Sequence, residues 1–215
     1  MKTFEQWDID DVERTFGLRR TDTLDELDAW LRAKQEITEQ ERATTQHLQA
    51  NLLHKIDIWN EDELKFKFIA PFISIVGYDT DRFNAFTQRT LKATVNGVFL
   101  SGRVDFVVAT GKSKPIQPFF FLHEYKRTRG RENDPLAQLL VEMLAARELN
   151  NHQYPLYGCY VQGRNWFFVV LDGQEYAESF AYDATKDEVF SMLRILKEAK
   201  AIITRLAEKY AEQYS

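Results

Sequence analysis

The chain has 215 residues, of which 44% are hydrophobic and 28% are charged, and its formal net charge is −5. This composition predicts a globular domain with a full core and excludes a disordered chain. The sequence has no apolar run of membrane-spanning length, no apolar segment near its acidic start, and one cysteine, Cys159. We therefore expect a cytoplasmic protein without a disulfide framework, and not one that binds nucleic acid by bulk charge.

Residues 1–58 read as a helical extension in front of a core. Thr23-Leu-Asp-Glu26 and Thr38-Glu-Gln-Glu41 have the form of capping boxes, and apolar residues recur at helical spacing after each of them. A further helix is expected to begin at Asn60, and Pro71 inside its apolar pattern predicts a kink or a local break. The extension is expected to cover one face of the core or to contact a partner.

The next segment reads as three strands. Residues 82–95 and 98–110 are predicted strands joined by Asn96-Gly97, a dipeptide that favours a type I′ hairpin turn. A polar turn at 111–115 then leads into the apolar run that ends in Glu124-Tyr125-Lys126. Such continuous apolar runs are typical of strands that are covered on both faces.

Three charged residues interrupt this second hairpin. A turn centred on Lys114 and Pro115 places Asp105 opposite Glu124, and Lys126 lies on the same face as Glu124 because side chains alternate along a strand. Two opposed carboxylates repel each other unless a cation lies between them, and Mg²⁺ suits an all-oxygen site of this kind. The alternative is a set of plain salt bridges, in which Arg103 or Lys126 neutralises Asp105.

The remaining elements are a helix, two strands and a final helix. Asp134-Pro135 opens the first helix as N-cap and N1 residues, with its apolar positions on one stripe. Strands are predicted at 157–162 and 166–172. The last helix, within 184–215, has apolar residues at heptad spacing, which predicts either packing on the N-terminal helices or a seam with a second copy or a partner subunit.

Asp105 and Glu124-Tyr125-Lys126, in a strand–turn–strand–helix context, resemble the signature of the PD-(D/E)XK nucleases, although Val104 stands where the family name has proline. The chain resembles in particular the N-terminal nuclease domain of type I restriction enzyme R subunits, over about residues 59–172. The resemblance implies an α/β fold with a restriction-endonuclease-like αβββαβ core and a mixed sheet. This core would span 59–183, between the N-terminal extension and the C-terminal helix.

The resemblance also implies metal-dependent hydrolysis of nucleic acid, and of DNA in particular. Mg²⁺ or Mn²⁺ would be bound by Asp105, Glu124, the carbonyl group of Tyr125 and Glu63, and Lys126 would orient or stabilise the attacking hydroxide. Gln138 matches a glutamine that faces the active site in many of these nucleases. Two of these assignments have alternatives: Glu63 fits a capping box with Asn60, and Gln138 fits a surface position beside the apolar stripe.

Basic residues flank this hairpin and are predicted to contact phosphates, with ordinary solvated surface as the alternative. They are Lys112, Lys114, Arg127, Arg129 and Arg131. The rival to a nuclease is a catalytically silent module that retains the fold and binds nucleic acid or scaffolds a partner.

Overall fold

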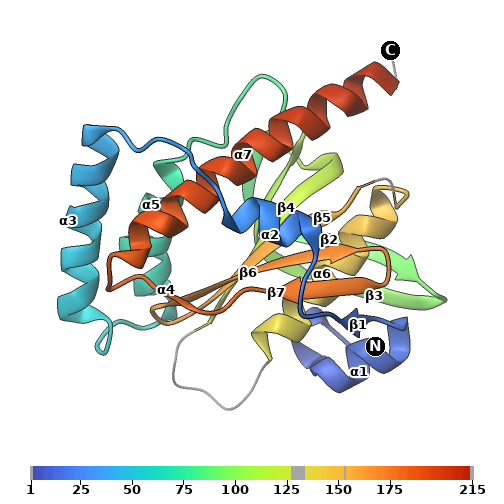
Figure 1. Ribbon diagram of the computed structural model, residues 1–215. Coiled ribbons are helices and arrows are strands. Elements are labelled where there is room, and N and C mark those ends of the chain that lie inside the picture. Colours follow the sequence, from blue (N-terminus) through green and yellow to red (C-terminus); the bar gives the residue numbers. More distant parts are fainter. Residues whose placement is uncertain (1, 127–133, 153, 214–215) are drawn as a thin grey trace.

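The computed structural model in Figure 1 describes residues 2–126, 134–152 and 154–213. Within these residues, eight strands form one mixed sheet with helices on both faces, which confirms the predicted α/β class and mixed sheet. The strand order is β1-β7-β6-β5-β4-β3-β2, with β8 paired to β6. The pairs β4–β5 and β1–β7 are parallel and the others are antiparallel. The strands are β1 (Arg19–Arg20), β2 (Asn84–Val95), β3 (Val98–Thr110), β4 (Ile116–Lys126), β5 (Leu156–Gln162), β6 (Asn165–Asp172), β7 (Glu175–Glu178) and β8 (Tyr182–Asp183).

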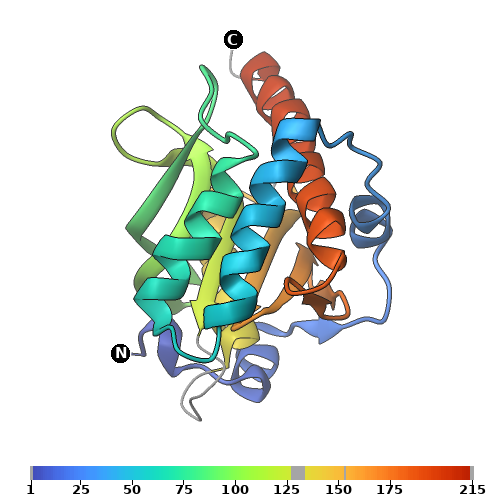
Figure 2. The same cartoon turned by 90° about the vertical axis from the view of Figure 1, so that its left-hand side faces the viewer.

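Helices cover both faces of this sheet. Figure 2 shows α3, the α4–α5 segment and α7 side by side across one face. The opposite face packs against α6, which is itself covered by the N-terminal η1 and α1. The helices are η1 (Phe4–Gln6), α1 (Ile9–Phe16), α2 (Asp25–Leu31), α3 (Glu39–Lys55), α4 (Glu61–Leu64), η2 (Lys65–Ile69), α5 (Ala70–Ser74), α6 (Pro135–Leu149) and α7 (Glu188–Gln213). None of the helices in the described ranges is both long and apolar enough to cross a bilayer.

The two predicted hairpins are present. Asn96 and Gly97 both have positive φ, at 49° and 79°, as a type I′ turn requires. This turn joins β2 to β3 in a ladder that runs from Val95 opposite Val98 to Asn84 opposite Ala109. The polar turn at 111–115 joins β3 to β4.

The helix α6 is buried around its whole circumference, and not along one stripe as predicted. Leu136 to Arg147 are all buried. The reason is the N-terminal segment: Phe4, Trp7 and Val12 pack in the same hydrophobic core as α6 and cover the side that the sheet leaves open. The N-terminal segment thus shares one core with a helix that lies more than 120 residues later in the sequence.

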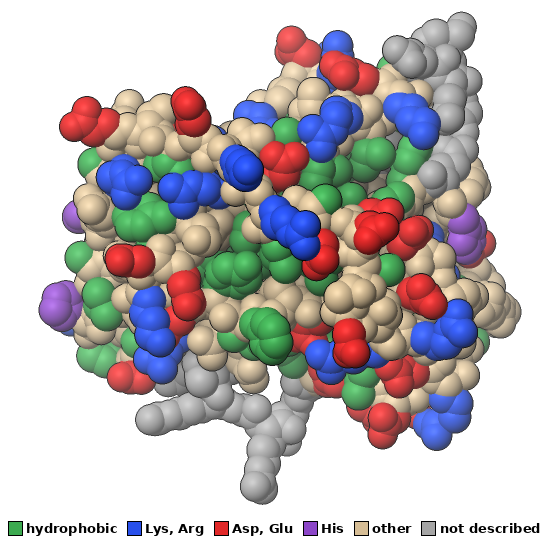
Figure 3. Space-filling view, in the orientation of Figure 1, with side chains coloured by type: hydrophobic (Ala, Val, Ile, Leu, Met, Phe, Trp, Pro, Cys, Tyr) green, Lys and Arg blue, Asp and Glu red, His purple; other side chains and the backbone are tan. Residues whose placement is uncertain are grey.

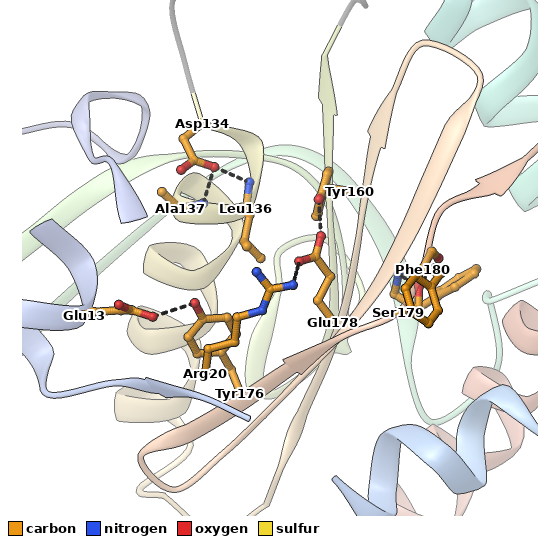
Figure 4. Close-up of polar contacts among 11 residues, drawn as sticks. Glu13, Arg20, Asp134, Leu136, Ala137, Tyr160, Tyr176, Glu178, Ser179 and Phe180 are labelled. Atoms are coloured by element: carbon orange, nitrogen blue, oxygen red, sulfur yellow. Dashed lines mark hydrogen bonds and ion pairs between the residues drawn. The ribbon is translucent and has the colours of Figure 1, made fainter. Parts of the chain in front are cut away.

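Polar contacts tie the N-terminal segment to the edge of the sheet (Figure 4). Arg20 Nη2 lies 3.0 Å from Glu178 Oε2, and the Tyr160 hydroxyl donates to the other oxygen of that carboxylate. Tyr176 donates to Glu13 Oε1 at 2.8 Å. Residues 2–58 are therefore built into the sheet and both of its faces, and they include a strand, β1, that the sequence did not predict.

The helix is not broken at Pro71, where a kink or a local break was predicted; it continues through α5, and the helix type changes ahead of the proline. A proline cannot donate to the preceding turn and its ring crowds the carbonyl group there. The helix responds with one π-helical turn, η2, in which the amide of Ala70 donates to the carbonyl of Lys65. Turns of this type add one residue to the helix surface and are frequent at functional sites.

The predicted helix starts are confirmed at three positions and wrong at one. Thr38, Asn60 and Asp134 each accept backbone N–H groups as N-caps. At α2 the N-cap is Leu24, without a side-chain cap, and the predicted Thr23 box is wrong. The helix α7 packs within the chain: Trp30 Nε1 donates to its Ile195 carbonyl at 2.8 Å, which favours the intramolecular alternative over a seam between copies.

Candidate functional site

A cavity of about 730 Å³ lies where the α4–η2–α5 segment faces the carboxyl end of β4 and the middle of β3. Asp105, Glu124 and Tyr125 reach it from the sheet, and Gln138 reaches it from α6. Helix residues, including Glu61, Asp62, Lys65 and Phe66, make the opposite wall. Sheet and helices from both faces therefore contribute side chains to one cavity.

The ladder between β3 and β4 has the predicted register. Phe106 pairs with His123 and Val107 pairs with Leu122, so that Asp105 and Glu124 come level with each other one residue further along. Both line the cavity. Glu124 is 1% exposed, and the side chain of Asp105 is 12% exposed. Two carboxyl groups, one on each strand, are thus brought together away from bulk water.

Asp105 is held by three donors. Oδ1 accepts Lys65 Nζ at 3.1 Å and Gln88 Nε2 at 2.6 Å, and Oδ2 accepts the backbone N–H of Tyr125 at 3.2 Å. Gln88 has a φ of 55°, which is unusual for a residue other than glycine and marks local backbone strain beside the site. These contacts orient the Asp105 carboxylate across the cavity.

Lys65 is a site residue that the sequence reasoning missed. Its ammonium group bridges Glu61 Oε1 at 2.7 Å and Asp105 Oδ1 at 3.1 Å. Burial lowers the pKa of Lys65, but the charges of Asp105 and Glu61 outweigh burial and raise it overall, so the group stays protonated. The ion pair of Asp105 therefore goes to a helix on one face of the sheet, and not to the predicted Arg103. The spacing of four residues indicates the ion pair between Glu61 and Lys65, but it does not indicate the contact of Lys65 with Asp105.

Glu142 is the second missed residue. It is fully buried on α6, one turn after Gln138, and Gln138 Nε2 donates to its Oε1 at 3.1 Å. Burial raises the pKa of Glu142 well above its ordinary value, and the nearby charge of Glu124 adds to this. A carboxyl group in such surroundings holds its proton. The sequence signal was present, since Glu142 is an acidic residue within an otherwise apolar helix.

Gln138 lies in the cavity wall and not on the surface. It is 2% exposed and lines the cavity together with Glu124. Its Oε1 is buried and has no hydrogen-bond partner among the described residues. The alternative of a surface glutamine is therefore wrong, and Gln138 lines the same cavity as Asp105 and Glu124.

Glu63 takes the capping position. Its carboxylate accepts the N–H of Asn60 at 3.0 Å and pairs with Lys67 Nζ at 2.7 Å, so its oxygens serve the helix start. Glu61 and Asp62 line the cavity, whereas Glu63 is not among the described residues that do so. The structure thus displays the capping contacts of Glu63, which are compatible with either assignment.

The predicted basic residues fall into two groups. Arg127, Arg129, Arg131 and the side chain of Lys126 lie outside the described part of the chain, although the Lys126 backbone pairs with Gln162 as the last residue of β4. Lys112 and Lys114 are exposed in the turn before β4. At about 3.3 Å per residue, that turn is roughly 30 Å from the end of β4 that carries Glu124. Lys112 and Lys114 are therefore far from the cavity.

His123 points away from Glu124, as strand alternation predicts. It is fully buried among aromatic rings, with Phe121 at 4.4 Å and Phe106 at 5.3 Å between ring centroids. Burial lowers its pKa to about 3. Its ring is therefore neutral at physiological pH and belongs to the core.

The donor set of the cavity suits a hard divalent cation. Asp105, Glu124 and the orphaned Oε1 of Gln138 offer oxygen atoms, which Mg²⁺ and Mn²⁺ prefer. In the residues that the structure describes, no group of three or more His, Cys, Asp or Glu side chains is arranged to hold a metal ion. On the face seen in Figure 3, acidic and basic side chains are interspersed and not gathered by sign. The candidate site is therefore the local group of oxygen donors in the cavity, and not a broad basic surface.

Comparison with known proteins adds no identity to this geometry. No family model matches the chain, and no curated protein gives a significant match to it.

Proposed function

We propose that the protein is a metal-dependent nuclease that hydrolyses phosphodiester bonds of nucleic acid, and of DNA in particular. The observation that carries this proposal is the position of Asp105 and Glu124, level on neighbouring strands and lining one cavity with Gln138. The proposal agrees with the resemblance of Asp105 and Glu124-Tyr125-Lys126 to the PD-(D/E)XK signature. A restriction-endonuclease-like core is part of the same proposal, since its αβββαβ order matches α4–α5, β2, β3, β4, α6 and β5.

The residues of the cavity have distinct roles in this proposal. Asp105 and Glu124 would hold Mg²⁺, with the Tyr125 carbonyl group and Gln138 Oε1 as further oxygen donors. A bound divalent cation supplies a water of lowered pKa and polarises a phosphate oxygen. Lys126, at the end of the strand that carries Glu124, would orient the nucleophile and counter the charge that develops on the phosphate. Lys65 and Gln88 keep the Asp105 carboxylate oriented toward the cavity.

The second candidate is a silent module that binds nucleic acid or scaffolds a partner. Lys65 favours it, because an ion pair already balances the Asp105 carboxylate. In this alternative the charged cluster is a structural tie between α4–η2 and the sheet, and a divalent cation adds nothing to stability.

A metal titration separates the two candidates. A ligand that binds the folded state raises the melting temperature, so Mn²⁺ should stabilise the wild-type protein and should lose this effect in Asp105→Asn and Glu124→Gln. Glu39→Gln, at an exposed position on α3, is the matched control and should respond like the wild type. Equal responses in all four proteins would contradict the metal site and favour the scaffold.

A cleavage assay then tests the chemistry. With Mg²⁺ and DNA, Lys126→Ala should abolish cleavage, because the charge at the end of β4 is lost, while the Mn²⁺ shift in melting temperature survives. Cleavage by the Lys126→Ala protein at the wild-type rate would remove this lysine from the mechanism.

A further inference from the structure

Phe66 is an exposed aromatic residue at the wall of the cavity. Its exposed fraction is 80%, although large apolar side chains of this chain are mostly buried, and it lines the same cavity as Asp105. It lies in the π-helical turn η2, directly after Lys65, which points into the cavity at Asp105. The turn that Pro71 forces on the helix thus presents a cation and an aromatic ring side by side.

The helix surface around Phe66 forms a shelf. Asp62, Phe66, Ala70 and Ser74 recur every four residues, all four are exposed, and all four line the cavity. Residues at this spacing lie along one ridge of a helix. The side chains of Ala70 and Ser74 are small, so the face of the Phe66 ring is not crowded from that end of the ridge.

The two sides of the cavity differ in chemistry. The sheet side presents the carboxylates of Asp105 and Glu124, and the helix side adds the Phe66 ring with the apolar Ala70 and Ile73, beside the charged side chains of Glu61, Asp62 and Lys65. A nucleotide has the same division, with an anionic phosphate group and a planar base that buries its face on aromatic rings. The carboxylate pair, with the cation that it would hold, therefore suits the phosphate group of a nucleotide, and the Phe66 ring suits its base.

We infer that Phe66 is a stacking platform for an unpaired base of the nucleic-acid strand whose phosphate lies at Asp105 and Glu124. The inference rests on the proposed function and adds the substrate class. In a duplex both faces of a base are covered by its neighbours in the stack, so a base can lie on Phe66 only when it is unstacked. The substrate is accordingly a single strand, or a duplex that is opened at the point of cleavage.

Fluorescence binding assays with Mn²⁺ present test this inference in the Lys126→Ala background, which should be inactive while it keeps metal binding. The probe is a single-stranded DNA oligonucleotide with one 2-aminopurine base, whose fluorescence is quenched by stacking, and the same sequence as a duplex is the comparison. Phe66→Ala should weaken single-strand binding about tenfold or more and remove the quenching. Phe66→Trp should keep both the single-strand binding and the quenching. Phe66→Leu, which is apolar but not planar, should behave like Phe66→Ala.

The matched control is Phe180→Ala. Phe180 is 95% exposed and is not among the described residues that line the cavity, so its removal should leave binding and quenching unchanged. Because Phe66 is exposed, its variants should keep the parent melting temperature, which is measured alongside.

The outcomes separate the inference from the proposed function. Equal binding and quenching with Phe66→Ala or Phe66→Leu would overturn the stacking role while leaving the nuclease proposal in place. Tighter binding of the duplex than of the single strand in the parent protein would overturn the substrate class. If the parent with Phe66 intact binds neither oligonucleotide, the inference and the proposed function fall together.

Discussion

Lys65 Nζ lies 3.1 Å from Asp105 Oδ1, so a helix on one face of the sheet supplies the cation for a carboxylate on β3. Both side chains are largely shielded, with exposed fractions of 22% for Lys65 and 12% for Asp105. An ion pair in such surroundings cannot lose one partner without leaving a poorly solvated charge. The same contact places a fixed positive charge where the proposed metal would bind.

Lys65→Met should therefore have two effects. Without metal, the free energy of unfolding should fall by about 1–3 kcal/mol, because a charged hydrogen bond to Asp105 is lost. With Mn²⁺, the melting temperature should rise more than in the wild-type protein, since the cation no longer competes with a lysine. Urea unfolding and a Mn²⁺ titration measure the two effects.

Lys67→Met is the matched control for this prediction. Lys67 pairs with Glu63 at 2.7 Å and Lys65 pairs with Glu61 at 2.7 Å, with the same spacing of four residues, but Lys67 is not among the described donors to Asp105. The control should unfold and bind Mn²⁺ much like the wild type. Identical Mn²⁺ responses in the two variants would mean that Lys65 does not compete with the metal.

Glu142→Gln should stabilise the protein, and more so as the pH rises. The pKa of Glu142 is raised in the folded state, so the folded protein holds a proton that the unfolded chain releases. The stability that protonated Glu142 contributes is fully present below its pKa in the unfolded chain. It is lost as the pH rises through its pKa in the folded protein. A glutamine can still accept from Gln138 without that loss. Urea unfolding from pH 4 to pH 9 should show that the free energy of unfolding of Glu142→Gln exceeds that of the wild type by an amount that grows with pH.

Glu148→Gln controls for a change of charge on the same helix. Glu148 is more exposed than Glu142 and pairs with His152 at 2.9 Å, and its replacement should not produce a gain that grows with pH. A constant difference between wild type and Glu142→Gln across the pH range would contradict a raised pKa.

His123→Leu should make the protein less sensitive to acid. Burial lowers the pKa of His123 from 6.5 to about 3, so the unfolded chain takes up a proton that the folded protein refuses. The contribution of neutral His123 to the free energy of unfolding is fully present above pH 6.5. It is lost as the pH falls toward 3. Between pH 7 and pH 4.5 the loss should be about 3 kcal/mol at 1.36 kcal/mol per pH unit.

Urea unfolding at these two pH values should show a smaller fall for His123→Leu than for the wild type. His54→Ala, at an exposed position on α3, should fall as much as the wild type. Parallel losses in all three proteins would indicate that acid acts through other groups.

The two groups of basic residues should differ in their contribution to nucleic-acid binding. Phosphate contacts release counterions, so each one steepens the fall of affinity with salt. Arg129→Ala with Arg131→Ala should flatten this dependence, because both follow the strand that carries Glu124. Lys112→Ala with Lys114→Ala should change it less, since the turn lies roughly 30 Å along β4 from the cavity. The comparison uses the Asp105→Asn background, and the opposite order would place the nucleic acid along the turn.

Local chemistry allowed much of the fold to be predicted from the sequence. The Asn96-Gly97 turn, the N-caps at Thr38, Asn60 and Asp134, and a helix irregularity near Pro71 depend on neighbouring residues. A hairpin centred on Lys114 and Pro115 predicted Asp105 level with Glu124, and the ladder has this register at the site, although it starts with Thr110 opposite Ile116 and shifts register twice beside Ala109. Such features involve short loops, whose closure costs little entropy and leaves few alternatives.

The contacts that complete the site were decided by tertiary structure. Lys65 meets Asp105 across 40 positions of the chain, and α6 is buried all round because Phe4 and Trp7 return to cover it. Hydrophobic burial of the helices drives both arrangements. Its free energy depends on the buried area and not on direction, so no local sequence pattern identifies which distant residue will be in contact. The sequence predicted the level position of the two carboxylates, but not the two register shifts in the β3–β4 ladder. The lysine, the buried Glu142 and the aromatic shelf around them exist only once the helices are packed on the sheet.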